Sequence, residues 1–65
     1  MLNINDVKEL DQLNVGDDFR LSEELNVLIT DMGRNLMNIQ TEHISVMAYP
    51  LGDNSYKLQD KEINI

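Results

Sequence analysis

Residues 25–49 read LNVLITDMGRNLMNIQTEHISVMAY and hold the longest run of apolar and β-branched residues in the chain. On both sides of the cluster DMGRN, at 31–35, apolar residues recur at every second position. A period of two places successive side chains on opposite faces of a strand. Short loops that contain glycine join such strands in hairpins, so this stretch predicts a β-hairpin that turns at Gly33.

A short helix is predicted upstream of the hairpin. Ile4, Val7, Leu10 and Leu13 recur at every third residue, which marks one face of a helix. Asn5 stands where a capping residue would accept hydrogen bonds from the first helical N–H groups.

Residues 22–30 admit two interpretations. Ser22 is placed to cap a second helix that would run toward Gly33. The β-branched side chains instead favour a turn over 22–24 and a strand over 25–30; they are Val27, Ile29 and Thr30. We adopt the turn and the strand, and the helix remains the alternative.

Three further strands follow from alternation and turn chemistry. Residues 17–21 predict a first strand, and residues 55–59 predict a strand that returns after the turn sequence PLGDN at 50–54. Residues 40–43 are polar and predict either a tight turn or a bend within one long strand. The tail at 62–65 alternates again and predicts a last edge strand.

These elements predict one small domain, residues 1–65, of the α+β class. A short N-terminal helix would be followed by a small antiparallel sheet or a partly closed barrel of four to six strands. The segment LNVGDDFRL, at 13–21, resembles the first strand of SH3-like small barrels, and that resemblance implies the barrel arrangement.

The size of the chain limits how it is stabilised. A domain of 65 residues buries only about 60% of the surface of its unfolded chain. The absence of cysteine excludes disulfides and thiolate metal sites, and a single histidine argues against a histidine metal cluster, so we expect no metal and no cofactor. Self-association remains, and we predict a homodimer. No signal peptide or apolar run of bilayer length is evident, so we expect a cytoplasmic protein that does not bind a membrane.

Charge is distributed unevenly along the chain. The net charge is −7, and residues 1–31, with eight acids against two bases, carry −6 of it. Phosphates need lysine and arginine, so direct binding to nucleic acid is disfavoured. A basic protein would be attracted chiefly to the N-terminal half.

Catalysis finds no support in the sequence. His43 is the only histidine, and none of the three serines lies in a glycine-flanked nucleophile elbow. Calcium-loop and phosphate-loop patterns are absent as well. We therefore predict that the protein is not an enzyme; a pocket holding His43 in contact with a carboxylate is the observation that would reopen the question.

An acidic cluster is the sharpest functional feature. Carboxylates spaced along strands, about 6.6–6.8 Å apart at alternate residues, imitate part of a phosphate backbone. We predict a partner-binding surface formed by Asp11, Asp17, Asp18, Glu23, Glu24 and Asp31. The alternative is that the charge only keeps the protein soluble.

Size, acidity and the absence of cysteine and catalytic groups resemble the small host-takeover proteins of bacteriophages, among them acidic DNA mimics. The resemblance rests on the net charge and on Asp17, Asp18, Glu23, Glu24 and Asp31. It implies a homodimer in the bacterial cytoplasm that occupies the DNA-binding arms of a basic host protein, with an HU-type nucleoid protein as the first candidate. The rival hypothesis is a structural or adaptor small-barrel module of a phage or larger assembly, which binds through a sheet edge or an apolar patch and is nearly indifferent to salt.

Overall fold

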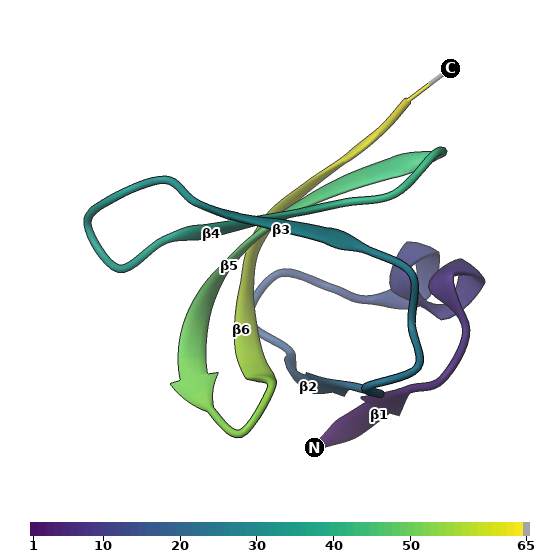
Figure 1. Ribbon diagram of the computed structural model, residues 1–65, viewed down its shortest axis with the longest axis horizontal. Coiled ribbons are helices and arrows are strands. Elements are labelled where there is room, and N and C mark those ends of the chain that lie inside the picture. The colour runs from purple at the N-terminus through teal and green to yellow at the C-terminus, as the bar shows by residue number, and fades with distance from the viewer. Residues whose placement is uncertain (65) are drawn as a thin grey trace.

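The computed structural model describes residues 1–64, and in this range six strands form one mixed sheet (Figure 1). The strand order is β1-β2-β6-β5-β4-β3. The elements are β1 (Leu2–Ile4), η1 (Val7–Gln12), β2 (Asp18–Leu21), β3 (Leu28–Asp31), β4 (Met37–Gln40), β5 (Ile44–Gly52) and β6 (Ser55–Ile63). No helix in the described range is long and apolar enough to cross a bilayer.

The predicted α+β class is wrong, because the only helix among residues 1–64 is the short 3₁₀ helix η1 and the fold is a small all-β fold. The physical reason is in the spacing: a period of three matches the 3.0 residues per turn of a 3₁₀ helix better than the 3.6 of an α-helix. The cap is Asp6 rather than Asn5. Asp6 accepts a hydrogen bond from the N–H of Lys8 at 2.9 Å, and Glu9 accepts one from the N–H of Asp6 at 2.9 Å. This capping box orders a helix too short to persist by propensity alone.

The sheet is mixed rather than antiparallel because β1 pairs in parallel with β2. Leu2 lies opposite Phe19 and Ile4 opposite Leu21. The chain passes through η1 between the two strands, which gives the crossover that parallel neighbours require. Strand β1 is not among the predicted elements, since three residues are too few to show alternation.

The predicted hairpin is confirmed as β3–β4. Ile29 faces Ile39 across the pair, and Gly33, Arg34 and Asn35 all have positive φ in the connecting turn. Residues 22–24 form a turn, so the helical alternative for 22–30 is wrong, although β3 starts at Leu28 and not at 25.

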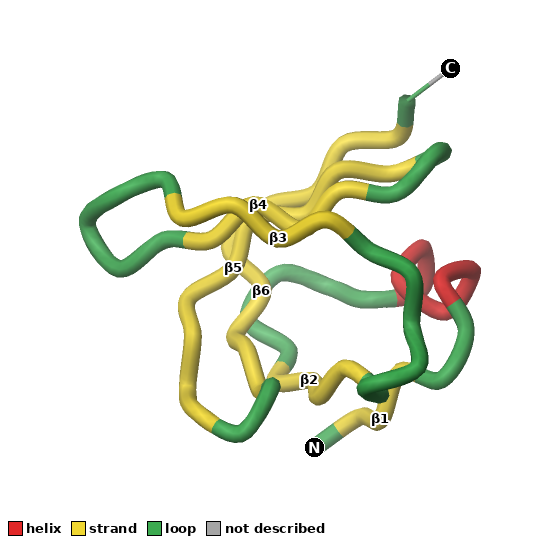
Figure 2. The backbone as a smooth tube through the Cα atoms, in the orientation of Figure 1, coloured by secondary structure: helices red, strands yellow, loops and turns green. Residues whose placement is uncertain are grey.

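The β5–β6 hairpin is the longest part of the sheet and joins its two halves (Figures 1 and 2). Its turn lies within the predicted 50–54 segment, where Gly52, Asp53 and Asn54 have positive φ. Register shifts at Met47/Ala48 and Pro50/Gly52 interrupt the pairing. Such irregularities bend strands, and the bent hairpin places β3 and β4 at one end of the curved sheet and β1 and β2 at the other.

The turn at 40–43 is tight, and the predicted tail strand is the end of β6, which reaches Ile63; residue 65 lies outside the described residues. The sheet does not close into a barrel within residues 1–64, because β1 and β3 are its two ends and do not pair.

The core lies on the concave face of the sheet and under η1. Phe19 and Tyr56 stack with their ring centroids 5.7 Å apart. The fully or nearly buried apolar residues are Ile4, Leu10, Leu13, Phe19, Leu21, Ile39, Ile44, Val46, Ala48, Tyr56 and Leu58. Leu25, Val27 and Met37 pack against this cluster but are only partly buried, so the core continues to the surface on that side.

Candidate interaction groove

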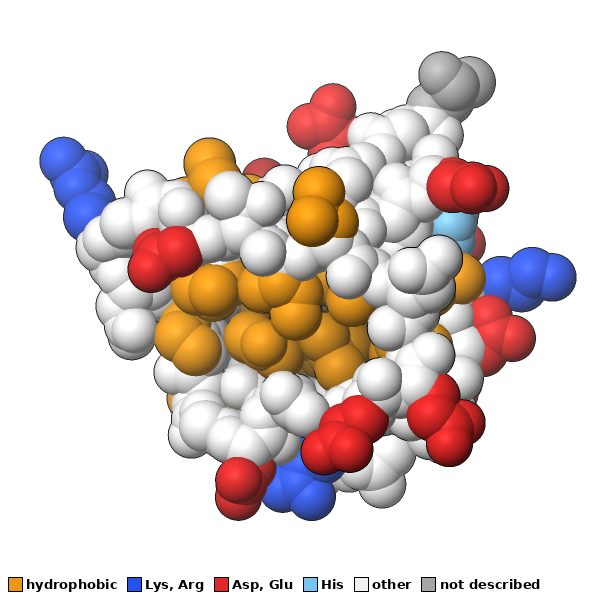
Figure 3. Space-filling model, in the orientation of Figure 1, with side chains coloured by type: hydrophobic (Ala, Val, Ile, Leu, Met, Phe, Trp, Pro, Cys, Tyr) orange, Lys and Arg blue, Asp and Glu red, His pale blue; other side chains and the backbone are white. Residues whose placement is uncertain are grey.

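An apolar groove opens where the core reaches the surface. The groove has a volume of about 260 Å³, and its lining residues are Leu21, Ser22, Glu23, Leu25, Val27, Ile29 and Asn54. Figure 3 shows apolar side chains gathered in the hollowed centre of this face, with acidic side chains around them. The volume is below the range of about 300–1,000 Å³ of pockets that enclose small molecules, so the groove suits a few side chains of a partner.

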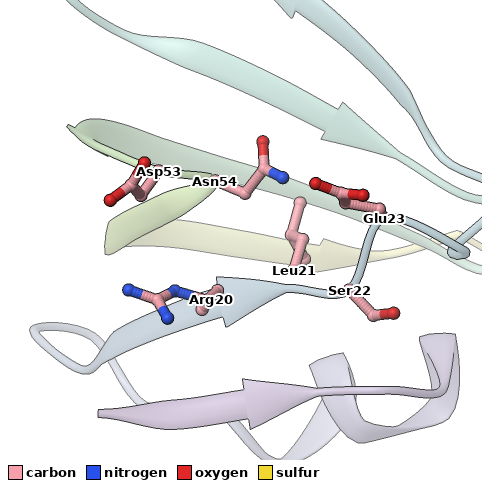
Figure 4. Close-up of a pocket in the computed structure, with 6 residues that line it drawn as sticks. All are labelled: Arg20, Leu21, Ser22, Glu23, Asp53 and Asn54. Carbon is pink, nitrogen blue, oxygen red and sulfur yellow. The ribbon is translucent and has the colours of Figure 1, made fainter.

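The groove continues into a polar hollow of about 510 Å³ beside the β5–β6 turn. The two hollows share Leu21, Ser22, Glu23 and Asn54, and the polar one adds Arg20 and Asp53. In Figure 4 the Arg20 and Glu23 side chains lie toward opposite ends of this hollow. The Arg20 Nε donates a hydrogen bond to Ser55 Oγ at 3.3 Å, which holds the guanidinium at its end.

Strand β3 forms one wall of the groove and is the least buried strand of the sheet. All four of its residues are exposed, and among the strands of residues 1–64 it pairs only with β4. The side chain of Ile29 lines the groove, on the face of the sheet that it shares with its buried partner Ile39, whereas Leu28 points to the opposite face.

A hydrogen bond in the β3–β4 turn shows which residues of β3 direct their backbone groups toward β4 and which direct them to the free edge. Met32 N–H donates to the carbonyl of Leu36 at 2.8 Å, toward β4. Backbone groups of successive strand residues point to alternate edges, so Leu28 and Thr30 also bond toward β4. Ile29 and Asp31 then direct their N–H and C=O groups away from the sheet, and within residues 1–64 no strand pairs with that edge.

Acidic side chains outnumber basic ones around the groove. Glu23 and Asp53 line it, and Asp31 lies on the same face of β3 as Ile29. Arg20 is the one base among the lining residues. Among the residues that line the two hollows, two carboxylates against one guanidinium leave a local charge of about −1, which favours a partner with lysine or arginine beside its apolar residues.

Two of the six predicted partner-binding residues are paired with bases. Asp11, in η1, contacts His43 with 2.8 Å between Oδ1 and Nε2. Asp18, at the start of β2, forms an ion pair with Lys57, with 2.7 Å between Oδ1 and Nζ. Both contacts are substantially exposed, and the Lys57 ammonium offsets the charge of Asp18.

The other four predicted residues lie at three separate places. Asp17 accepts a hydrogen bond from Asn14 N–H at 2.8 Å in the loop before β2. Glu23 and Glu24 share the turn after β2, and Asp31 accepts a hydrogen bond from Gly33 N–H at 2.8 Å at the end of β3. Of these four, Glu23 lines the groove, Asp31 lies two residues after Ile29 on the same face of β3, and Asp17 lines a different hollow beside η1.

His43 lies in a hollow of about 330 Å³ and touches a carboxylate, which is the feature named above for an enzyme. Its Nδ1 lies 3.3 Å from the hydroxyl of Thr41. That hydroxyl already makes hydrogen bonds within the turn. It accepts from the N–H groups of His43 and Ile44, and it donates to the Ile44 carbonyl oxygen at 3.1 Å. The cluster ties η1 to the β4–β5 turn, and a saturated threonine is a poor nucleophile.

The groove itself is not evident from the sequence. Leu25 and Val27 were assigned to a regular strand, but they belong to the segment before β3, where they face the core. Their alternation with Asn26 gave the correct face, and only the tertiary structure shows that nothing among residues 1–64 covers it. A group of three or more side chains suited to hold a metal ion is not found in the described part of the chain.

No known protein family, curated protein or solved structure matches this chain in sequence or fold.

Proposed function

We propose that this protein is a non-enzymatic binding module for a basic protein, and that it acts in the cytoplasm as an adaptor through the groove beside β3. The observation that carries the proposal is the opening of the core to solvent between β2 and β3, with acidic residues beside it. Exposed apolar patches framed by polar residues are typical of protein interaction sites. Side chains of a partner that entered the groove would cover the part of the core that is open to solvent.

A capture experiment with a matched pair of variants tests the proposal. Ile29→Thr removes apolar surface from the groove, and Leu28→Thr makes a similar change on the opposite face of the same strand. A bound basic protein should be retained by the wild type and by Leu28→Thr, and lost with Ile29→Thr. Equal retention by both variants would contradict the proposal.

A DNA-mimic inhibitor, with an HU-type nucleoid protein as its first target, is the second candidate. The net charge of −7 and the adjacent exposed carboxylates of Glu23 and Glu24 favour it. This function requires binding that weakens steeply with salt and that duplex DNA displaces. Simultaneous Asp→Asn and Glu→Gln changes at Asp17, Asp18, Glu23 and Glu24 should then abolish binding, while Ile29→Thr should leave it intact.

The two candidates differ in where the binding free energy arises. A groove-bound partner gains most of it from buried apolar surface, so salt should alter the association rate more than the lifetime of the complex. A decoy gains it from charge, so salt should change the affinity by orders of magnitude.

A further inference from the structure

Strand β3 combines three features that together specify the form of a ligand. Its outer edge offers unpaired backbone groups at Ile29 and Asp31, its inner face adjoins the apolar groove, and carboxylates lie at the groove. A ligand that only inserted side chains into the groove would use only the second feature. An extended peptide that pairs with β3 uses all three.

We propose that the groove binds an extended segment of a basic protein, which adds to the sheet as a further strand along the free edge of β3. This inference rests on the proposed function and specifies how the partner is recognised. The added strand exchanges hydrogen bonds with the N–H and C=O groups of Ile29 and Asp31.

The register of an added strand determines which side chains the partner must have. A residue opposite Ile29 directs its side chain to the same face, into the groove, and a residue opposite Asp31 faces that carboxylate. Positions between them point away from the groove with Leu28 and Thr30. The recognised pattern therefore has two apolar residues, two positions apart, that face the groove. A basic residue lies two positions beyond each of them on the same face, to meet Asp31 at one end and Glu23 at the other.

Charge favours such a segment over a second copy of this chain. Pairing of β3 with its own counterpart would bring two molecules of net charge −7 together at their acidic grooves. Like charges placed opposite one another across strands are destabilising. A basic segment instead gains attraction from Glu23, Asp31 and Asp53, opposed only by Arg20 among the lining residues.

A synthetic peptide, acetyl-Lys-Thr-Val-Thr-Val-Thr-Lys-amide, is the probe for this mode of binding. Its pattern is the same in both directions, so it can pair in either orientation. Amide hydrogen exchange is measured by NMR on the full chain with and without the peptide. We expect exchange at Ile29 and Asp31 to slow at least about tenfold at saturation, while Thr30, already bonded to β4, changes little.

Two modified peptides separate backbone pairing from simple charge attraction. Replacing both lysines by glutamate should abolish binding. N-methylation of alternate amides on one edge of the peptide should weaken binding at least about tenfold, the effect of losing two hydrogen bonds, while methylation on the other edge should be tolerated.

Three results would overturn the inference. The first is failure of the lysine peptide to bind at millimolar concentration. The second is binding without protection of Ile29 and Asp31, which leaves the proposed groove function intact but removes the added strand. The third is protection of these two amides that appears without peptide and rises with protein concentration, which would identify a second copy of this chain as the occupant.

Discussion

The β5–β6 hairpin and strand β3 belong to the same sheet but differ in what surrounds them. Along β5, Ile44, Val46 and Ala48 are fully buried at alternate positions, and both strands of the hairpin have neighbours on the other side. Along β3 every residue is exposed, and no strand from the described part of the chain lies beside one of its edges. We therefore expect the hairpin to contribute more to the stability of the fold than β3, which forms the wall of the groove.

The largest expected effect separates the two regions by stability. Leu58→Ala in β6 truncates a side chain that is 1% exposed and should cost about 2–5 kcal/mol, because it leaves a cavity in the core. Leu28→Ala in β3 truncates one that is 67% exposed and should change the free energy of unfolding by no more than about 0.5 kcal/mol. Urea denaturation measures both. Equal losses would show that β3 is as integral to the core as β6.

The next effect concerns binding rather than stability. Ile29→Thr should weaken the affinity for the lysine peptide about tenfold, or about 1.4 kcal/mol, because it removes apolar surface from the groove. The free energy of unfolding should fall by less than about 1 kcal/mol. Leu28→Thr is the control, and fluorescence anisotropy with a labelled peptide gives both affinities. A larger loss with the control would place the peptide on the wrong face.

A smaller effect is expected from the charges beside the groove. The double variant Glu23→Gln, Asp53→Asn should slow association of the lysine peptide by a few-fold at low salt, since charges at the rim of an interface act mainly on the association rate. Glu42→Gln with Glu62→Gln removes the same formal charge away from the groove and serves as the control. Stopped-flow measurements that slow equally for both pairs would indicate a response to net charge alone.

The smallest effect is predicted for the contact between η1 and the β4–β5 turn. Asp11→Asn weakens the pair with His43, whose side chains are 44% and 35% exposed respectively. Exposed pairs contribute about 0–1 kcal/mol, and we expect a loss in that range with unchanged peptide affinity. Thermal unfolding and anisotropy measure the two quantities. A clear loss of peptide affinity would connect this distant cluster to the groove.

Local chemistry made the hairpins predictable. Gly33 and the Gly52–Asn54 turn adopt positive φ, which their residue types favour, and the alternation around them gave the correct faces. The predicted α-helical face is wrong because a spacing of three is the period of a 3₁₀ turn. Strand β1 depends on pairing with β2 across the intervening η1 helix, and no local pattern reports such a contact.

The candidate site was less predictable than the fold. The positions of the carboxylates along the chain do not reveal that Asp11 meets His43 or that Asp18 meets Lys57, contacts made between distant segments. The groove exists because no segment of residues 1–64 covers Leu25 and Val27, and in the sequence these two look like ordinary core residues. Of the six predicted residues, Glu23 lines the groove, and Asp31 lies at the end of β3 on the same face as Ile29.

Amide hydrogen exchange of the free protein, at a dilution where it is monomeric, tests the central contrast most directly. We predict strong protection at Val46 and Ala48, protection at Leu28 and Thr30, and exchange close to the unprotected rate at Ile29 and Asp31. Strong protection of Ile29 and Asp31 in the free monomer would mean that the edge of β3 is already covered, and the account of an open groove would be contradicted.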